Sequence, residues 1–259
     1  MKLLFVYSHA EPQYWKDGLY MALKEFEDVT YYNMALDEQP LGVFDFTLGW
    51  GGFGSPVEEY LSRCSGRKGL CIGGNTTMPI YNDYSVLFYE TDWVREFLKL
   101  DELKVPLVKA FGINNELFKL PFKKVPIVWD YLGVGALAFW KRWERFIDKK
   151  GRRLVIGDFQ KNNLSESLDI VVQLMMGRVM VSNQVLPEDL VYYYHRAKTV
   201  YLPANTQGGS ERCVLEARNS GCKVEIESDN PKLKELLTCK IPTYKDYAKK
   251  LKEGILCVL

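Results

Sequence analysis

Thr206-Gln-Gly-Gly-Ser-Glu-Arg-Cys-Val-Leu-Glu-Ala-Arg-Asn-Ser-Gly-Cys-Lys-Val-Glu-Ile226 decides the fold, because it combines a glycine loop, a helix and a strand in succession. Ser210 is a favourable N-cap, Glu211 suits the first helical turn, and Gly221 suits the end of the helix. Free N–H groups at such a helix start favour a phosphate. Two glycines before a helix are also common in ordinary turns, so the stretch alone leaves both interpretations open.

The rest of the chain repeats this order of strand, loop and helix. Apolar runs predict strands at residues 2–7, 29–33, 44–48, 69–72, 86–89, 105–110, 127–132, 153–156, 179–181, 199–202 and 223–226. Helices are predicted at residues 17–27, 57–64, 93–99, 140–148, 164–176 and 187–197. The alternation is typical of parallel sheets with crossover helices, whose ligands bind at the carboxyl ends of the strands.

A change in composition divides the chain. Residues 118–126 contain two prolines and three lysines, as in an exposed linker. The strand and helix pattern restarts after this segment. We therefore predict an α/β protein with two Rossmann-like domains, residues 1–121 and 122–259, and a ligand cleft between them.

The composition indicates a folded cytoplasmic protein. The chain has 259 residues, of which 47% are hydrophobic, and a formal net charge of +1. A hydrophobic content this high is typical of a folded chain, and a net charge near zero argues against extensive binding of nucleic acid. Its six cysteines lack the spacing of a metal site, no apolar run reaches the roughly 18 residues of a membrane span, and the apolar start is too short for a signal peptide. We expect reduced thiols and a cytoplasmic location, with peripheral attachment to a membrane as an alternative.

Four segments, in this order, are similar to the motifs of one enzyme family. They are Phe111-Gly-Ile-Asn-Asn-Glu-Leu-Phe118, Val134-Gly-Ala-Leu-Ala-Phe-Trp-Lys141, Val185-Leu-Pro-Glu-Asp-Leu-Val-Tyr-Tyr-Tyr-His-Arg-Ala197, and the opening stretch from Gly208. Together they resemble glycosyltransferase family 4 (glycosyl transferases group 1), whose members have the GT-B fold. The resemblance runs from about residue 84 to 237 and is only topological before that. It implies transfer of a hexose or pentose from a nucleoside diphosphate sugar, with UDP or GDP as the nucleotide.

The resemblance implies that Lys141 and Arg142 are the catalytic residues. Their cations would neutralise the diphosphate as the nucleotide leaves, and fixed cations can replace a metal ion there. The family generally retains the anomeric configuration and needs no metal, so we expect no cofactor and no metal site. A solvent-exposed charged helix face is the alternative interpretation of this Lys-Arg pair.

The resemblance also implies a donor site in the C-terminal domain. Backbone N–H groups of the glycine loop and helix start would hold the phosphates, Glu216 would bind the ribose hydroxyls, and residues near Val185 would lie against the base. The implied donor-binding residues are Gly208, Gly209, Ser210, Glu211, Arg212, Glu216 and Val185. Capping, or pairing with Arg218 or Arg212, is the alternative role of Glu216.

Two positions depart from the family pattern. Gly208 stands where the family usually has a glutamate that contacts the donor sugar, and Ala136 stands where it has an arginine. Gln207 or Glu211 could substitute for the glutamate. A nucleotide-sugar-binding module without catalytic activity is therefore the alternative function.

The acceptor is less well defined by the sequence. His9 follows the first strand, and Gly51 and Gly52 permit close approach of a ligand, although ordinary loop roles explain all three equally well. A glycan, a lipid-linked glycan or a modified nucleic acid is expected as acceptor. The basic residues between 119 and 153 suit a polyanionic partner, but solvation of a linker and a helix explains them too.

Overall fold

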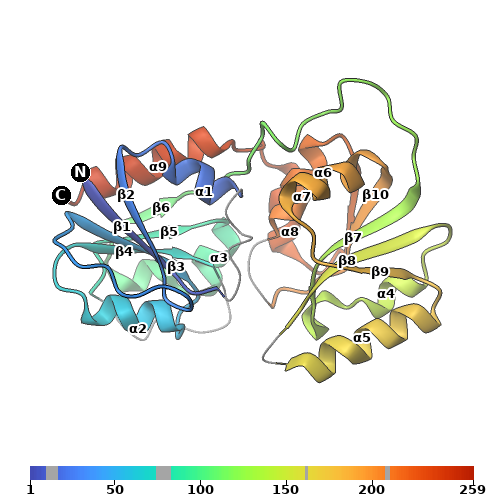
Figure 1. Cartoon of the computed structure of the whole chain (residues 1–259), viewed down its shortest axis with the longest axis horizontal. Coiled ribbons are helices and arrows are strands. Elements are labelled where there is room, and N and C mark those ends of the chain that lie inside the picture. The colour runs from blue at the N-terminus through green and yellow to red at the C-terminus, as the bar shows by residue number, and fades with distance from the viewer. Residues whose placement is uncertain (10–16, 74–82, 161–162, 208–210) are drawn as a thin grey trace. The chain divides into compact units, whose positions relative to one another are not determined.

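The chain folds into two α/β units, shown in Figure 1. The structure is a computed structural model, and it describes residues 1–9, 17–73, 83–160, 163–207 and 211–259. The first unit contains residues 1–113 and 242–259, and the second contains residues 114–207 and 211–241. No helix in these described ranges is long and apolar enough to cross a membrane.

The first unit is built on a parallel sheet with the strand order β2-β1-β3-β4-β5-β6. Its strands are β1 (Lys2–Tyr7), β2 (Asp28–Asn33), β3 (Phe46–Gly51), β4 (Lys68–Ile72), β5 (Val86–Tyr89) and β6 (Leu107–Lys109). Its helices are α1 (Gly18–Leu23), α2 (Pro56–Arg63), α3 (Asp92–Phe97), the short 3-10 helix η2 (Leu100–Leu103) and α9 (Tyr244–Leu256).

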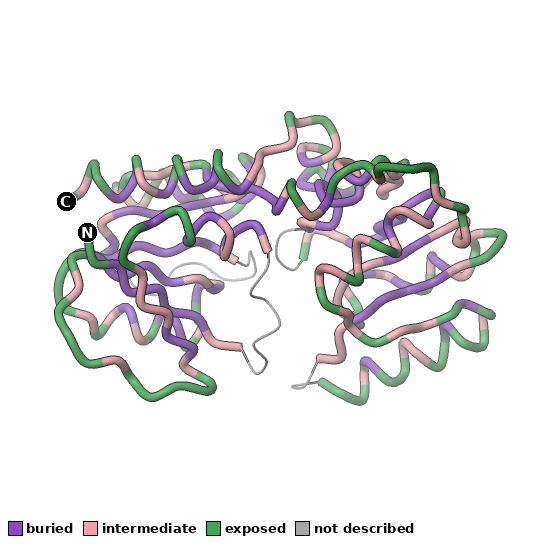
Figure 2. Tube along the Cα trace, turned by 45° about the horizontal axis from the view of Figure 1, so that its top comes forward, coloured by how far each residue is buried: buried purple, intermediate pink, exposed green. Residues whose placement is uncertain are grey.

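Alternation along β1 builds two separate cores in this unit. Leu3 and Phe5 pack in the cluster that includes residues of α1 and α9, whereas Leu4 and Val6 pack in the cluster that includes residues of α2 and α3. Successive side chains of a strand point to opposite faces of a sheet, so a strand covered on both faces is apolar throughout. Figure 2 shows the strands as largely buried segments and the connecting loops as more exposed ones.

The second unit is built on a parallel sheet with the strand order β11-β10-β7-β8-β9. Its strands are β7 (Trp129–Leu137), β8 (Arg153–Phe159), β9 (Met180–Asn183), β10 (Ala197–Leu202) and β11 (Lys223–Ile226). Its helices are η3 (Phe139–Lys141), α4 (Glu144–Ile147), α5 (Leu164–Met176), α6 (Pro187–His195), α7 (Arg212–Asn219) and α8 (Pro231–Thr238). Figure 1 shows α4 and α5 on one face of this sheet and α6 and α7 on the other.

The units divide differently from the two domains expected from the sequence. The expected boundary lay between residues 121 and 122, but residues 114–121 belong to the second unit, where Phe118 is buried and packs edge-on against Tyr194 with ring centroids 5.8 Å apart. Residues 242–259 were expected in the C-terminal domain. They belong to the first unit, because α9 buries Leu251 and Ile255 in the core beside β1.

The predicted strands are found, with shifted ends, but the helix expected at residues 140–148 is broken. A 3-10 turn, Phe139–Lys141, and the short helix α4 replace it, and Arg142 between them has φ +50°. The helix of the opening stretch begins at Arg212 with Glu211 at the N-cap position, and Ser210, the predicted N-cap, lies outside the described residues. Helices α8 and α9 follow the last predicted element, the strand at residues 223–226.

The start of α9 gives a first testable prediction. Thr243 and Asp246 form a capping box, in which each side chain accepts a hydrogen bond from the other residue's backbone N–H, at 3.1 and 2.9 Å. Replacing Thr243 by alanine should lower the free energy of unfolding by about 1 kcal/mol, because a helix N–H loses its partner. Urea denaturation measures this loss. The control is Lys250→Ala, at an exposed site of the same helix, and an equal loss in both variants would contradict the capping role.

Candidate functional site

The carboxyl ends of β7 and β10 form the topological switch point of the second sheet. The two strands are neighbours, but the chain continues from β7 to β8 on one side and from β10 to β11 on the other. Ligands of open parallel sheets bind at this kind of position, because the loops there diverge. Residues 138–143 follow β7, and residues 203–211 follow β10.

A buried ion pair joins these two loops. The Nζ atom of Lys141 lies 2.5 and 2.6 Å from the two carboxylate oxygens of Glu211, and the two residues are only 7% and 3% exposed. The stem of Lys141 passes close to Gly135, where an added Cβ would lie 3.0 Å from Nζ and 3.1 Å from Cε. Gly135 thus leaves the room in which Lys141 reaches Glu211. The structure brings together a predicted catalytic residue, Lys141, and a predicted donor-binding residue, Glu211, and it joins them through their side chains.

Arg142 points to other partners. Its guanidinium donates to the carbonyl oxygens of Pro203, at 2.6 Å, and Ala204, at 3.1 Å, and it forms a two-pronged pair with Asp229 at 2.5 and 2.8 Å. The hydrogen bond from Arg142 lowers the pKa of Asp229 to about 2. These contacts fix the loop after β10 to the loops after β7 and β11. The predicted role of Arg142 as a second phosphate cation stays a prediction, and it requires some of these bonds to be exchanged.

Further hydrogen bonds hold the same loops. The backbone N–H of Asn205 donates to the carbonyl of Trp140 at 2.8 Å, and the side chain of Asn230, which is fully buried, donates to the carbonyls of Ala204 and Asn205, both at 2.8 Å. These bonds tie together the loops that follow β7, β10 and β11, and the first of these loops carries Lys141. A site of this kind holds its charged groups in place before a ligand arrives.

Glu216 lies on α7 with its carboxylate buried. The Tyr194 hydroxyl, on α6, donates to it at 3.2 Å, and burial together with the charge of Glu216 raises the pKa of Tyr194 well above its usual value. Arg218, one of the alternative partners of Glu216, instead donates to the carbonyls of Leu236 and Cys239. Tyr194 was not among the residues predicted for the site, although it lies in the motif that precedes the donor loop.

For the remaining predicted donor-site residues the structure gives positions only, and their roles stay predictions. Arg212 is half-buried and begins α7, and Val185 follows β9, which is separated from β7 by β8 in the sheet. Gly208, Gly209 and Ser210 lie outside the described residues. Among the residues that the structure does describe, no three His, Cys, Asp or Glu side chains are grouped to hold a metal ion. The expectation that no metal is needed stays a prediction.

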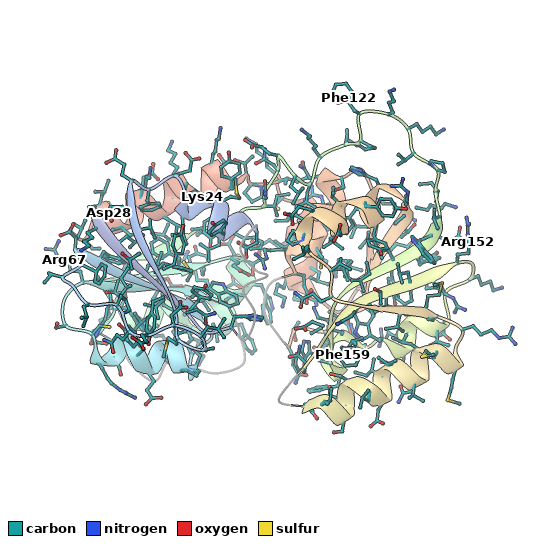
Figure 3. All side chains as sticks on the ribbon, viewed as in Figure 1. Lys24, Asp28, Arg67, Phe122, Arg152 and Phe159 are labelled. Carbon is teal, nitrogen blue, oxygen red and sulfur yellow. The ribbon has the colours of Figure 1, made fainter. Side chains whose placement is uncertain are left out.

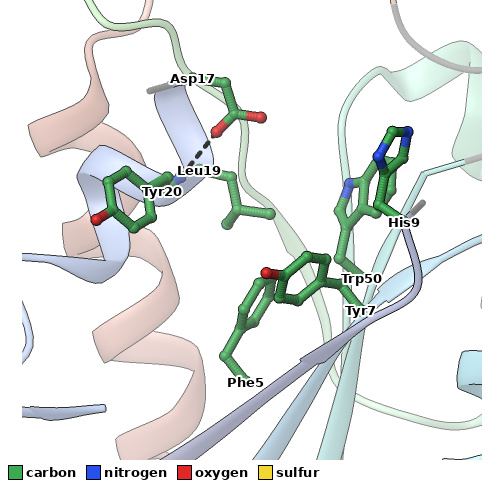
Figure 4. Close-up of a pocket in the computed structure, with 7 residues that line it drawn as sticks. All are labelled: Phe5, Tyr7, His9, Asp17, Leu19, Tyr20 and Trp50. Atoms are coloured by element: carbon green, nitrogen blue, oxygen red, sulfur yellow. Dashed lines mark hydrogen bonds between the residues drawn. The ribbon is translucent and has the colours of Figure 1, made fainter. Parts of the chain in front are cut away.

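A pocket in the first unit, drawn in Figure 4, opens at the carboxyl end of its sheet. Its empty volume is about 450 Å³, part of it open to solvent. The residues lining it are mostly aromatic or aliphatic, with one imidazole and one carboxylate: Phe5, Tyr7, His9, Asp17, Leu19, Tyr20 and Trp50. Apolar walls with a few polar groups are typical of small-molecule sites.

The predicted acceptor-side residues lie at or next to this pocket. His9 lines it, and its backbone is fixed by Asn33, whose side chain accepts from the His9 N–H at 3.0 Å and donates to the His9 carbonyl at 2.8 Å. Gly51 ends β3 directly after Trp50, and Gly52 follows it. The structure therefore brings these three residues to one region, at the ends of β1 and β3. The aromatic walls of the pocket were not predicted, because an aromatic residue in an apolar run such as residues 2–7 indicates a buried strand and not a pocket wall.

Comparison with known proteins establishes the class of fold. No protein-family model and no curated protein sequence matches the chain. Among solved structures, HepE from Anabaena in complex with UDP and glucose has a TM-score of 0.65 at 11% identity, over 99% of this chain and 89% of HepE. A UDP-forming trehalose-phosphate synthase from Burkholderia xenovorans in complex with glucose-6-phosphate has a TM-score of 0.62 at 10% identity, over 98% and 92%.

A third similar structure is sucrose-phosphate synthase from Thermosynechococcus elongatus. It has a TM-score of 0.58 at 13% identity, over 83% of this chain and 69% of the synthase. At these identities the likeness concerns the fold, and it confirms the predicted class: two Rossmann-like domains of GT-B type.

Proposed function

We propose that the protein is a GT-B glycosyltransferase that takes a sugar from a nucleoside diphosphate donor, with UDP as the first candidate nucleotide. The observation that carries the proposal is the buried Lys141–Glu211 pair at the switch point between β7 and β10. A held ammonium at this edge of the sheet is the group that a diphosphate needs. The solved structures with this fold support it, since HepE was crystallised with UDP.

Lys141 is proposed to stabilise the negative charge that develops on the leaving nucleotide. When the bond between the anomeric carbon and the phosphate oxygen breaks, negative charge grows on the departing diphosphate. A fixed cation in a poorly hydrated site stabilises that charge more than water does. The start of α7 adds the partial positive charge of its N–H groups. Glu216 serves the ribose hydroxyls as hydrogen-bond acceptor, and Tyr194 keeps that carboxylate in place.

The acceptor is proposed to bind in the first unit, in the pocket lined by Tyr7, His9 and Trp50. Aromatic walls suit the apolar face of a sugar ring or another ring system. Retention of the anomeric configuration and independence from metal ions are part of the proposal, and they rest on the sequence resemblance. Both are measured directly once an acceptor is found, by the anomeric signal of the product and by assay in the presence of a chelator.

Calorimetric titration with nucleotides and nucleotide sugars, without added metal, tests the donor site. We expect micromolar binding of one nucleoside diphosphate or its sugar, weaker binding in Glu216→Gln, and none in the double variant Lys141→Met/Glu211→Met. The double variant removes both charges together, so that neither is left buried alone. Lys198→Ala is the control, because it removes an exposed lysine near the amino end of β10. Failure of every nucleotide to bind the wild-type protein would overturn the proposal.

A second candidate function, a nucleotide-sugar-binding module without transferase activity, is favoured by two observations. Glu211 already neutralises Lys141, and Gly208 stands where the family glutamate would contact the sugar. Donor binding without transfer to any acceptor, and without slow hydrolysis of the donor, would favour this module. Transfer or hydrolysis that is lost in the double variant would favour the enzyme.

A further inference from the structure

An arch of residues 119–127 stands out from the second unit, where the chain runs towards β7 (Figure 1). Its two ends are fixed. A ring nitrogen of His195 lies 2.7 Å from the carbonyl of Lys119, and the N–H of Val128 donates to the carbonyl of Arg196 at 2.8 Å. The segment between these ends is therefore held by α6 and the residues that follow it.

The arch exposes apolar side chains. Phe122 is 102% exposed, Leu120 67% and Ile127 46%. Figure 3 shows Phe122 at the outer turn of the arch, pointing away from the helices and the sheet. Exposed apolar side chains that are grouped together and bordered by polar residues often mark an interaction site for a membrane or a protein. Pro121 and Pro126 restrict the backbone around the ring, which lowers the entropy lost when it is held in place.

Positive charge surrounds these apolar side chains. Lys119, Lys123 and Lys124 are all exposed, and residues 117–129 contain no aspartate or glutamate. Arg152, in the turn between β7 and β8, is exposed and adds a cation at the base of the arch, where its guanidinium donates to the carbonyl of Ile127 at 3.4 Å. The arch thus presents exposed apolar side chains that are surrounded by basic residues.

We propose that this arch attaches the protein to the surface of a membrane containing anionic lipids. Phe122 and Leu120 enter the boundary between headgroups and acyl chains, and the lysines contact lipid phosphates. Apolar insertion and attraction to anionic headgroups together give reversible binding at the interface. Aliphatic Leu120 and Ile127 favour a bilayer over a nucleic acid, because bases stack on aromatic rings and guanidinium groups.

Another exposed apolar surface of the same unit provides a contrast. Leu168 and Val172 of α5 are about half exposed, but the same helix carries Glu166 and Asp169 and no basic residue. An anionic bilayer would repel this helix. Exposed apolar area alone therefore does not make a surface suitable for such a membrane, and the basic setting of the arch distinguishes it from α5.

The arch and the donor site lie at opposite ends of β7. The arch precedes Trp129, the first residue of this strand of nine, and Lys141 follows its last residue. At about 3.3 Å per residue the strand spans on the order of 30 Å. Membrane attachment through the arch therefore leaves the proposed nucleotide site uncovered, and it does not depend on the proposed function.

Co-flotation of the full chain with lipid vesicles tests this inference. We expect binding to vesicles of phosphatidylcholine mixed with phosphatidylglycerol, none to pure phosphatidylcholine, and weaker binding as salt is raised. Phe122→Ser should lower the partition coefficient by about tenfold, and Lys123→Ala/Lys124→Ala by more than tenfold. The matched control is Val172→Ser, which removes an exposed apolar side chain of α5 and should leave binding unchanged.

Several outcomes would overturn the inference. They are failure to bind the anionic vesicles, binding that Phe122→Ser leaves unchanged, and an equal loss in Val172→Ser. Binding of single-stranded RNA that the lysine variant abolishes, with no vesicle binding, would assign the arch to a nucleic acid instead. Nucleotide titration of Phe122→Ser separates this inference from the donor site, because the variant should bind nucleotide as the wild type does.

Discussion

Replacing Lys141 by methionine should lower the free energy of unfolding by about 3–5 kcal/mol, because it leaves the Glu211 carboxylate buried without its cation. Methionine keeps most of the length of the lysine stem, so the change removes a charge and little volume. The double variant Lys141→Met/Glu211→Met should recover most of this loss. Burial of two charges carries a large desolvation free energy. Replacing both by apolar side chains of similar volume therefore changes the free energy of unfolding little.

A double-mutant cycle in urea denaturation measures this coupling. The set comprises the wild type, each single variant and the double variant. A parallel cycle on the partly exposed pair of Lys149 and Glu225 is the control, where we expect a coupling of less than about 1 kcal/mol. If Lys141→Met lowers the free energy of unfolding no more than Lys149→Met does, the Lys141–Glu211 pair is open to water. Lys141 would then lack the poorly hydrated surroundings on which its proposed role depends.

The sequence predicted the architecture well, because two-sided burial of parallel strands leaves a local pattern. Strands β1 and β5, for example, are short apolar runs that end at a loop, and recognising such runs needs no knowledge of distant residues. Helix α9 also has a local signal, with the capping box of Thr243 and Asp246 and apolar residues at 244, 247, 248, 251 and 255. Its membership of the first unit has no such signal, because only packing against α1 and β1 decides it.

The sequence predicted roles for single residues of the candidate site, which stay predictions, and it did not predict the contacts between them. The motif resemblance identified Lys141 and Glu211 separately, whereas their ion pair joins positions 70 residues apart and leaves no trace in either segment. The break in the predicted helix at Arg142 has a similar cause. Arginine has no preference for positive φ, and bonds from its side chain to Pro203, Ala204 and Asp229 accompany that conformation.

Replacing Glu211 by glutamine should increase the affinity for a nucleoside diphosphate by about tenfold or more. In the wild type a diphosphate that approaches Lys141 meets a carboxylate whose oxygens lie 2.5 and 2.6 Å from the same ammonium. The two anions repel one another in a buried site, where charges interact more strongly than in water. Glutamine keeps the shape of the side chain and an oxygen that accepts from Lys141, so only the competing charge is removed.

Calorimetric titration of Glu211→Gln beside the wild type, with circular dichroism to confirm folding, measures this gain. Glu225→Gln is the control, because it removes a carboxylate from β11 that pairs with Lys149 and Lys223. Affinity that is unchanged or weaker in Glu211→Gln, while Glu225→Gln behaves as the wild type, would mean that the diphosphate does not compete for Lys141. Tighter binding would show instead that the protein holds its phosphate-binding cation neutralised until the donor arrives, since the same ammonium would serve Glu211 before binding and the diphosphate after it.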